Sequence, residues 1–466
     1  MWRFFKDFMT YGVVSILGKL AVVFLMPIYT SILTKEEYGA MALITSCKGI
    51  IDLISNLNIH SGIARDYYEE SINRKRLVST GFFSIFILSS IICAIGICTQ
   101  NFWSINVLGL EEKYSFAFLL MLLSIPCGSL LSYFAILTRF KKKPILYSVG
   151  SIMQLITQIG LSVYCVVFLR TGISGVFLSI VVSEVIGILY FSFINRSLLG
   201  WSYSFNYIKR ALLFAIPTLP AIVAGWLDSS VGQIVIGKTI SKEQLGVYSI
   251  ALSLSSVFTL LGTALQNVWS PFLYENYKKE TFNRDIHRLY TVFVVGLTFV
   301  SITLSLFSKE VILLLTNKGY LDARFYITLL CVPMCFYLLF PMASSGVSIS
   351  RDTKYVGYSY VAGSIMNIAV LYATIEYLGI IAVPLCLALS RIITYMILYK
   401  VSEKKISYKL PNYLLLILCV AVSLCYFMLT LDLSFITRIC IYLFLGGASV
   451  AYLLSHKNTL LSINKK

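Results

Sequence analysis

Charged side chains are scarce in this sequence. Asp, Glu, Lys and Arg make up 13% of its 466 residues, 58% of the residues are hydrophobic, and the mean hydropathy is +0.83. A soluble domain contains roughly 25% charged residues, so this chain has too little polar surface to stay in water. The shortage excludes soluble enzymes and secreted scaffolds and places the chain in a lipid bilayer.

Histidines and paired cysteines are also lacking. The chain has three His, and its eleven Cys contain no C-x-x-C pair. Single cysteines within apolar stretches, such as Cys93, Cys331 and Cys386, are typical of small buried side chains rather than of disulfides or zinc sites. We therefore expect no metal, no bound cofactor and no catalytic residue, and we predict that the protein is not an enzyme.

Acidic residues are outnumbered, at 21 against 38 basic ones, which gives a net charge of +17. The basic residues lie between apolar runs, where the positive-inside rule places them, so no nucleic-acid partner is expected. With both termini inside, 26 Lys and Arg fall in inner connections and nine in outer ones. This asymmetry predicts a multi-pass protein whose termini are both cytoplasmic.

Long apolar windows, in contrast, are abundant. About twenty apolar residues in a helix span the hydrocarbon core of roughly 30 Å. The sequence has fourteen such windows, at 11–32, 39–60, 79–99, 115–137, 145–169, 172–194, 211–230, 245–268, 289–308, 325–347, 355–376, 379–399, 412–431 and 435–454. The first window lacks an A-x-A cleavage site, so we expect it to be retained. The prediction is an all-α integral membrane protein with about 14 transmembrane helices.

An internal repeat divides these helices. TKEEYGAMAL at 34–43 matches SKEQLGVYSI at 241–250, which aligns Lys35 with Lys242 and Gly39 with Gly246, and YEESINRK at 68–75 echoes YENYKKET at 274–281. The offset spans six helices, so both copies enter the membrane in the same direction. We predict an N-terminal six-helix bundle at 1–194, a cytoplasmic linker at 195–210, a C-terminal six-helix bundle at 211–399, and two additional helices with a cytoplasmic tail at 400–466.

Six charged residues are candidates for a position deep inside the predicted helices, where a charge costs about 2.5–3.5 kcal/mol on insertion scales. Lys19 lies near the middle of the first helix, and Thr45, Lys48, Asp52 and Ser55 share one face of the second. We predict that Lys19 and Lys48 line a positive cavity for an anionic head group such as a diphosphate, with Asp52 tuning Lys48. Alternatively, Lys48 and Asp52 simply pair with each other at i, i+4.

The other three positions are Glu184 in the sixth helix, Asp228 near the outer end of the seventh, and Arg391 in the inner half of the twelfth. They are candidates for ion coupling or gating. Two alternatives stay open here: Glu184 and Asp228 can be hydrogen-bonded contacts within a bundle, and the long side chain of Arg391 can reach the inner surface.

Two regions of the sequence resemble a known family. The first helix followed by SILTKEEYGAMALITS, the repeat IGKTISKEQLGVYSIALSLSS, and Asp228 just before SSVGQIVIG are similar to the polysaccharide exporters of the multidrug/oligosaccharidyl-lipid/polysaccharide (MOP) superfamily. Within it, the chain most resembles the O-antigen and capsule repeat-unit flippases. The matching motifs cover about the first 70 residues and residues 211–275.

The resemblance implies that the protein moves an undecaprenyl-diphosphate-linked oligosaccharide from the cytoplasmic to the outer leaflet of the bacterial inner membrane. Alternating access coupled to an H⁺ or Na⁺ gradient is the implied mechanism. The implied fold is a MATE-like V of two parallel-repeat bundles around a cationic cavity, in which Lys19 and Lys48 occupy places similar to those of the family's basic residues. Expected partners are the lipid-linked glycan, membrane lipids, a polysaccharide polymerase and a chain-length regulator.

Two rival functions are less compatible with this sequence. A multidrug or small-cation exporter of the same superfamily needs an acidic and aromatic cavity, so the two lysines count against it. A membrane-embedded polysaccharide polymerase or acyltransferase needs a sizeable outer loop or a His-centred site, whereas His60, His287 and His456 all lie near predicted surfaces.

Overall fold

The computed structural model describes residues 16–455 apart from 19, 20, 22, 70, 351, 353, 407 and 432. Within these residues every regular element is a helix. Eleven helical stretches are long and apolar enough to cross a bilayer, and one of them, Lys354–Lys405, contains two consecutive helices. The shorter apolar helices Ile16–Ile32 and Phe435–Leu445 complete the fourteen predicted segments. The prediction of an all-α membrane protein with about fourteen transmembrane helices is confirmed.

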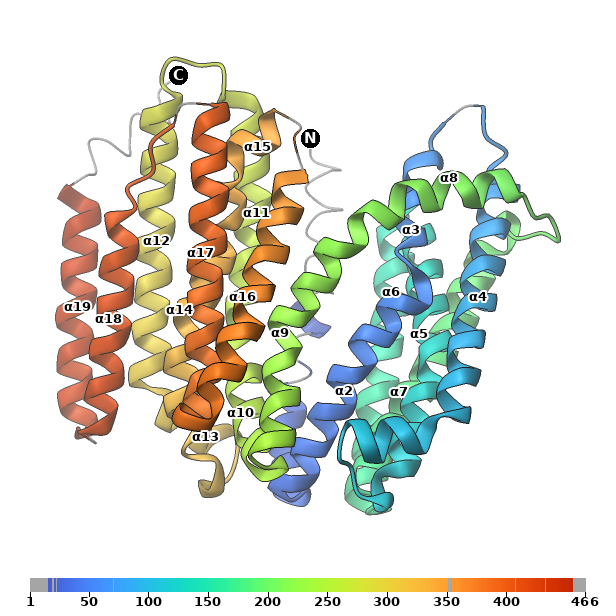
Figure 1. The fold of residues 1–466 in the computed structure, drawn as a ribbon, viewed down its shortest axis with the longest axis horizontal. Coiled ribbons are helices and arrows are strands. Elements are labelled where there is room, and N and C mark those ends of the chain that lie inside the picture. The colour runs from blue at the N-terminus through green and yellow to red at the C-terminus, as the bar shows by residue number, and fades with distance from the viewer. Residues whose placement is uncertain are drawn as a thin grey trace. The chain divides into compact units, whose positions relative to one another are not determined.

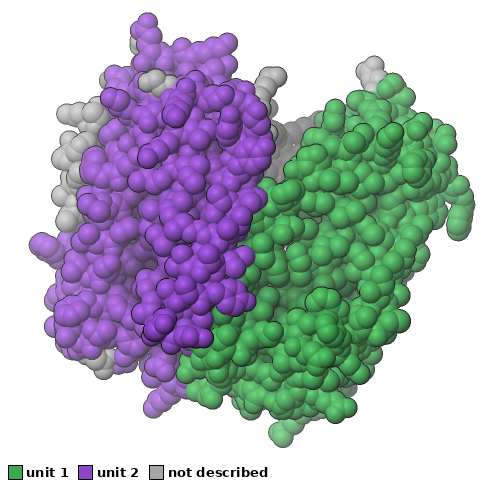
Figure 2. Space-filling model, in the orientation of Figure 1, with its two compact units in different colours: residues 1–249 green, residues 250–466 purple. Residues whose placement is uncertain are grey.

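The chain forms two compact units, Met1–Ser249 and Ile250–Lys466 (Figure 2). The main helices of the first unit (Figure 1) are α2 (Lys35–Asn56), α3 (Ile59–Asp66), α4 (Arg74–Cys98), α5 (Ser115–Phe140), α6 (Pro144–Val163), α7 (Ile173–Asn195), α8 (Phe205–Ala215) and α9 (Leu219–Thr239). Helix α10 (Lys242–Ser255) begins in the first unit and ends in the second.

The second unit contains nine further helices among the residues that are described. They are α11 (Val257–Asn276), α12 (Phe282–Leu306), α13 (Ser308–Leu315), α14 (Ala323–Ala343), α15 (Ser345–Ile349), α16 (Lys354–Leu378), α17 (Ala382–Lys405), α18 (Tyr413–Thr430) and α19 (Phe435–Ser455). These units are not the two sequence repeats, because α8, α9 and the start of α10 pack in the first unit. The repeat boundaries at 194 and 211 stay a prediction.

The ends of α2 follow from local sequence. Thr34 and Glu37 form a capping box at its start: the Glu37 N–H donates to Thr34 Oγ1 at 3.1 Å, and the Thr34 N–H donates to Glu37 Oε2 at 2.8 Å. At its other end Leu57 and Asn58 adopt positive φ angles of 44° and 54°, which terminates the helix. The chain then continues into α3, so the predicted window 39–60 is interrupted.

The predicted linker at 195–210 is bound to the first unit by polar contacts. The N–H groups of Gly200 and Ser204 donate to Ser79 Oγ and Thr80 Oγ1 at 2.8 and 3.0 Å. Arg210 at the linker's end forms an ion pair with the buried Asp66 of α3 at 3.2 Å. The linker is therefore a structural part of this unit, and α8 packs along α3.

The seventh predicted segment, 211–230, lies within the apolar helical stretch Phe205–Thr239. This stretch is divided into α8 and α9 by a short 3-10 turn at Ile216–Thr218. Pro217 and Pro220 lack the N–H groups that a continuous α-helix needs, which accounts for the division.

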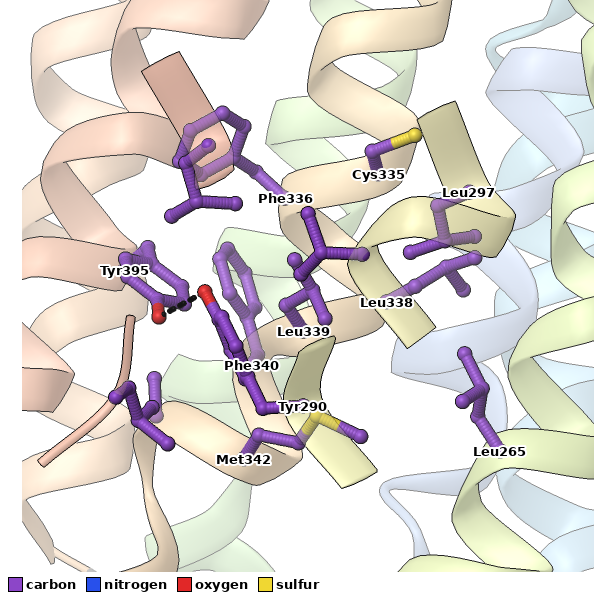
Figure 3. Packing of buried hydrophobic residues seen from close by; sticks show 14 of the residues in the cluster. Leu265, Tyr290, Leu297, Cys335, Phe336, Leu338, Leu339, Phe340, Met342 and Tyr395 are labelled. Carbon is purple, nitrogen blue, oxygen red and sulfur yellow. Dashed lines mark hydrogen bonds between the residues drawn. The ribbon is translucent and has the colours of Figure 1, made fainter. Parts of the chain in front are cut away.

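The core of the second unit combines large apolar side chains with a buried chain of hydroxyls (Figure 3). Tyr290 of α12 and Tyr395 of α17 share a hydrogen bond of 2.7 Å, and Tyr395 donates onward to Asn412 Oδ1 at 2.9 Å. Both tyrosines are fully buried. Because a buried hydroxyl needs a partner, this chain fixes the register of α12 and α17 against the loop that precedes α18.

Candidate functional site

Three charged residues from two helices meet inside the first unit. Helix α2 supplies Lys48 and Asp52, and α7 supplies Glu184. The Lys48 Nζ lies 3.1 Å from Asp52 Oδ2 and 3.7 Å from Glu184 Oε1. We call these residues the Lys48 cluster. The structure therefore brings together three of the six residues predicted from sequence, two of them for substrate binding and one for coupling.

A glycine makes room for the Lys48 cluster. A Cβ added to Gly128 of α5 would lie 3.1 Å from Glu184 Oε1 and 3.4 Å from Lys48 Nζ. The neighbouring Ser129 shares a hydrogen bond of 2.9 Å with Ser55, one turn beyond Asp52 on α2. Close approach of α5 thus encloses the charges from a third side.

The Lys48 cluster is largely shielded from solvent. The side chains of Lys48, Asp52 and Glu184 are 15%, 33% and 9% exposed. Glu184 Oε2 is buried and has no hydrogen-bond partner among the described residues. A buried carboxylate oxygen without a donor is costly, so Glu184 is the member of the cluster whose hydrogen bonding is incomplete among the described residues.

The Lys48 ammonium is compensated in this structure. Two carboxylates lie within 3.7 Å of it, so the cluster carries more acidic than basic groups. The pairing of Lys48 with Asp52, which sequence left as an alternative, is present, and Glu184 joins it. A bare positive cavity at Lys48 is not what these residues form, and the role of Lys48 toward a diphosphate stays a prediction.

Asp228 and Arg391 lie outside the Lys48 cluster. Lys19 lies outside the described residues. Asp228 is partly buried on α9, the helix that packs on α2 through a hydrogen bond of 3.1 Å from Trp226 Nε1 to the Ser46 carbonyl. Arg391 of α17 is 7% exposed and donates to the Pro333 carbonyl at 3.0 Å, so its side chain does not extend to the inner surface.

The two copies of the internal repeat meet in space at the starts of α2 and α10. A Cβ on Gly39 would lie 2.8 Å from the Lys242 carbonyl carbon and 3.1 Å from the Gly246 nitrogen. Reciprocally, a Cβ on Gly246 would lie 3.1 Å from the Lys35 carbonyl carbon and 3.3 Å from the Gly39 nitrogen. The helices cross with backbone against backbone, which only glycine at both positions allows. We call this contact the glycine crossing.

Ion pairs surround the glycine crossing. Lys35 of α2 lies 3.2 Å from Glu243 of α10, and Lys242 lies 3.7 Å from Glu111 in the connection between α4 and α5. Glu111 also pairs with Lys113 at 2.8 Å, and the hydrogen bond from Lys113 lowers the pKa of Glu111 to about 2. Exposed pairs are individually weak, but here they link three segments at one place.

Sequence reasoning aligned Gly39 with Gly246 without predicting that they touch. A glycine repeated at the same position of two helix starts is a usable signal for a close crossing. Gly128, in contrast, carried no signal, because a small residue in a membrane helix is usual.

The fold of this chain is similar to the folds of two solved membrane transporters. The structure is similar to that of the lipid II flippase MurJ in an inward closed conformation, with a TM-score of 0.73 and 14% identity over 98% of this chain and 100% of MurJ. It is also similar to an inward-facing multidrug resistance MATE family transporter of the MOP superfamily, with a TM-score of 0.67 and 16% identity over 84% and 94%.

The family follows from the sequence match. The model of a family described as polysaccharide biosynthesis protein matches residues 28–325, and the chain belongs to this family. The Lsg locus putative protein 1 of Haemophilus influenzae is 20% identical over 397 residues, which are 81% of this chain and 95% of that protein. The resemblance to polysaccharide exporters is confirmed, and the chain is a multi-pass membrane protein.

Proposed function

We propose that the protein moves an undecaprenyl-diphosphate-linked oligosaccharide from the cytoplasmic to the outer leaflet of the bacterial inner membrane by alternating access. The observation that carries the proposal is the partly buried Lys48 ammonium in a membrane protein of a polysaccharide biosynthesis family. A lipid-linked glycan offers a diphosphate to such a cation, and the charge-assisted contact is strong where water is scarce. The fold shared with the lipid II flippase MurJ supports the same substrate class.

Substrate binding at Lys48 requires a proton or a rearrangement. A diphosphate beside Lys48 would join two carboxylates within 3.7 Å of one ammonium, and such like charges repel one another. Protonation of Glu184, whose Oε2 has no partner among the described residues, releases Lys48 from one carboxylate. We therefore propose H⁺ rather than Na⁺ as the coupling ion, with Glu184 as the proton carrier and Asp52 retained to position Lys48.

Alternating access also needs a place where one side of the protein closes. The glycine crossing joins the starts of α2 and α10 through backbone contact and ion pairs. We propose that it is the closure on the outer side, since the positive-inside rule places both helix starts there. The polymerase and chain-length regulator stay predicted partners.

The test is replacement of Lys48 by Ala and by Arg in the native host, with surface polysaccharide as the readout and Lys143→Ala, an exposed loop lysine, as the matched control. We expect Lys48→Ala to abolish surface polysaccharide, Lys48→Arg to restore part of it, and Lys143→Ala to leave it unchanged at equal protein abundance. Normal export by Lys48→Ala would refute the proposal.

One observation favours a second candidate function. The Lys48 cluster holds two carboxylates and one ammonium, and an excess of acidic groups within a membrane protein suits an organic cation. A small-cation exporter predicts that Glu184→Gln abolishes efflux of a fluorescent cationic dye. The flippase predicts instead that Glu184→Gln impairs polysaccharide export and leaves dye efflux at background.

A further inference from the structure

The second unit contains a cavity of about 270 Å³ that the transport mechanism above does not use. Aromatic side chains dominate its wall, with contributions from α11, α14 and α16. They are Trp269, Tyr274, Tyr337, Phe340 and Tyr360. The volume lies just below the roughly 300–1,000 Å³ of sites for drug-sized ligands, so the cavity fits one small ring rather than an oligosaccharide.

The aromatic wall is fixed by its own contacts. The Phe340 ring lies 5.6 Å from that of Tyr337 and 5.4 Å from that of Tyr360, both edge-to-face. Trp269 Nε1 donates to the Pro341 carbonyl at 3.2 Å, and the Arg391 guanidinium lies 4.8 Å from the Tyr337 ring centroid. Arg391, predicted as a coupling residue, thus holds a wall of this cavity. Rings held in this way present a preorganised apolar surface.

Polar groups complete the lining. Gln266, Ser344 and Ser348 line the cavity, and their side chains both donate and accept hydrogen bonds. Pro341 has no N–H, so the carbonyl of Tyr337, four residues earlier in α14, loses its helical donor and can accept a hydroxyl. None of the described residues that line the cavity is charged.

Aromatic rings together with uncharged polar groups suit only one part of a lipid-linked glycan. A diphosphate needs cationic or backbone N–H donors, and the lining offers no Lys or Arg. A polyprenyl chain would leave the amide and hydroxyls unsatisfied. A pyranose ring matches both features, because its C–H face stacks on aromatic rings and its hydroxyls pair with amides and other hydroxyls.

We propose that this cavity binds one uncharged pyranose ring of the transported glycan. The inference rests on the proposed function and adds a sugar subsite in the second unit. The lining residues Tyr274 and Val356 lie near the end of α11 and the start of α16, within five residues in sequence of Lys278, Lys279 and Lys354. The positive-inside rule makes this the cytoplasmic end, where a lipid-linked sugar is available before transport.

The test is saturation-transfer difference NMR on the full-length protein in lipid nanodiscs, with methyl glycosides of glucose, galactose and N-acetylglucosamine as probes. We expect signal transfer to ring C–H protons, reduced at least fivefold in Tyr337→Ala. Tyr337 is 41% exposed, so this truncation leaves the fold intact. Tyr360→Ala is a second variant, and Tyr372→Ala, an exposed tyrosine on the same helix α16 that does not line the cavity, is the matched control.

Equal transfer in Tyr337→Ala and Tyr372→Ala, or no transfer from any of the three sugars, would overturn the sugar subsite. Competition by inorganic diphosphate would overturn it as well, because the cavity would then bind the charged group. This measurement needs no transport. If Lys48→Ala exports polysaccharide normally while Tyr337→Ala loses sugar binding, the proposed function fails and the subsite stands. If Lys48→Ala abolishes export while Tyr337→Ala binds sugar as the control does, the subsite fails and the proposed function stands.

Discussion

Replacing Gly39 by Ala tests whether the glycine crossing depends on backbone contact. The added methyl group would lie 2.8 Å from the Lys242 carbonyl carbon and 3.1 Å from the Gly246 nitrogen. These are backbone atoms, so no rotamer change relieves the overlap. The helices must separate by at least about 0.6 Å, the difference between 2.8 Å and the 3.4 Å of an ordinary contact. Overpacking of this kind lowers the free energy of unfolding by about 1–3 kcal/mol.

Two assays on purified protein report the effect. We expect Gly39→Ala to lower the midpoint of thermal unfolding, and to lower at least twofold the yield of maleimide cross-linking between Lys35→Cys and Glu243→Cys, whose native side chains lie 3.2 Å apart. Lys35→Cys alone reports the background from native cysteines.

The matched control is Gly160→Ala, because a Cβ on this α6 glycine meets nothing within 4 Å. If Gly39→Ala and Gly160→Ala behave alike in both assays, the close crossing of α2 and α10 is not a constraint on this protein and the reasoning fails.

Three further predictions follow from buried and surface charges. Lys48→Ala leaves two carboxylates uncompensated and should lower the free energy of unfolding by about 3–5 kcal/mol. Adding Glu184→Gln should restore most of the thermal stability, and no recovery would count against energetic coupling within the cluster. Arg438 is buried and forms a bidentate pair with Glu310 at 2.6 and 2.9 Å. Arg438→Met removes this pair and should therefore speed proteolysis of the connection before α19, and an unchanged cleavage rate would contradict the prediction. The pairing of Glu111 holds its pKa at about 2, below the ordinary value of a glutamate. The pairing therefore stabilises the folded state fully at any pH above that ordinary value, and this stabilisation is lost as the pH falls toward 2. The contribution of this pairing to the midpoint of thermal unfolding should accordingly stay constant from about pH 8 to about pH 5.

Most of the fold could be predicted from local sequence and composition. The fourteen apolar windows correspond to helices because a membrane span is set by hydropathy and length, which are local properties. The start of α2 at Lys35 was not predicted, although Thr34 and Glu37 stand at the spacing of a capping box; the predicted window begins at residue 39. The split at Pro217 and Pro220 was not recovered as a boundary, because proline in a membrane helix is often tolerated and its effect depends on neighbouring helices.

The candidate site could be predicted only in part. Lys48 and Asp52 were placed together because they are four residues apart on one helix. That Glu184, 136 positions beyond Lys48, completes the cluster depends on the packing of α2, α5 and α7 around Gly128, which no spacing in the sequence encodes.

The sequence by itself determined the membrane class, the approximate helix spans, the internal repeat and the identity of the charges that burial makes costly, because each of these depends on composition or on short-range order. Tertiary structure alone decided which carboxylates compensate Lys48, that the two repeated glycines touch, and that Trp269, Tyr337 and Tyr360 line one cavity. These are contacts between helices distant in the chain, and side-chain packing sets them rather than hydropathy.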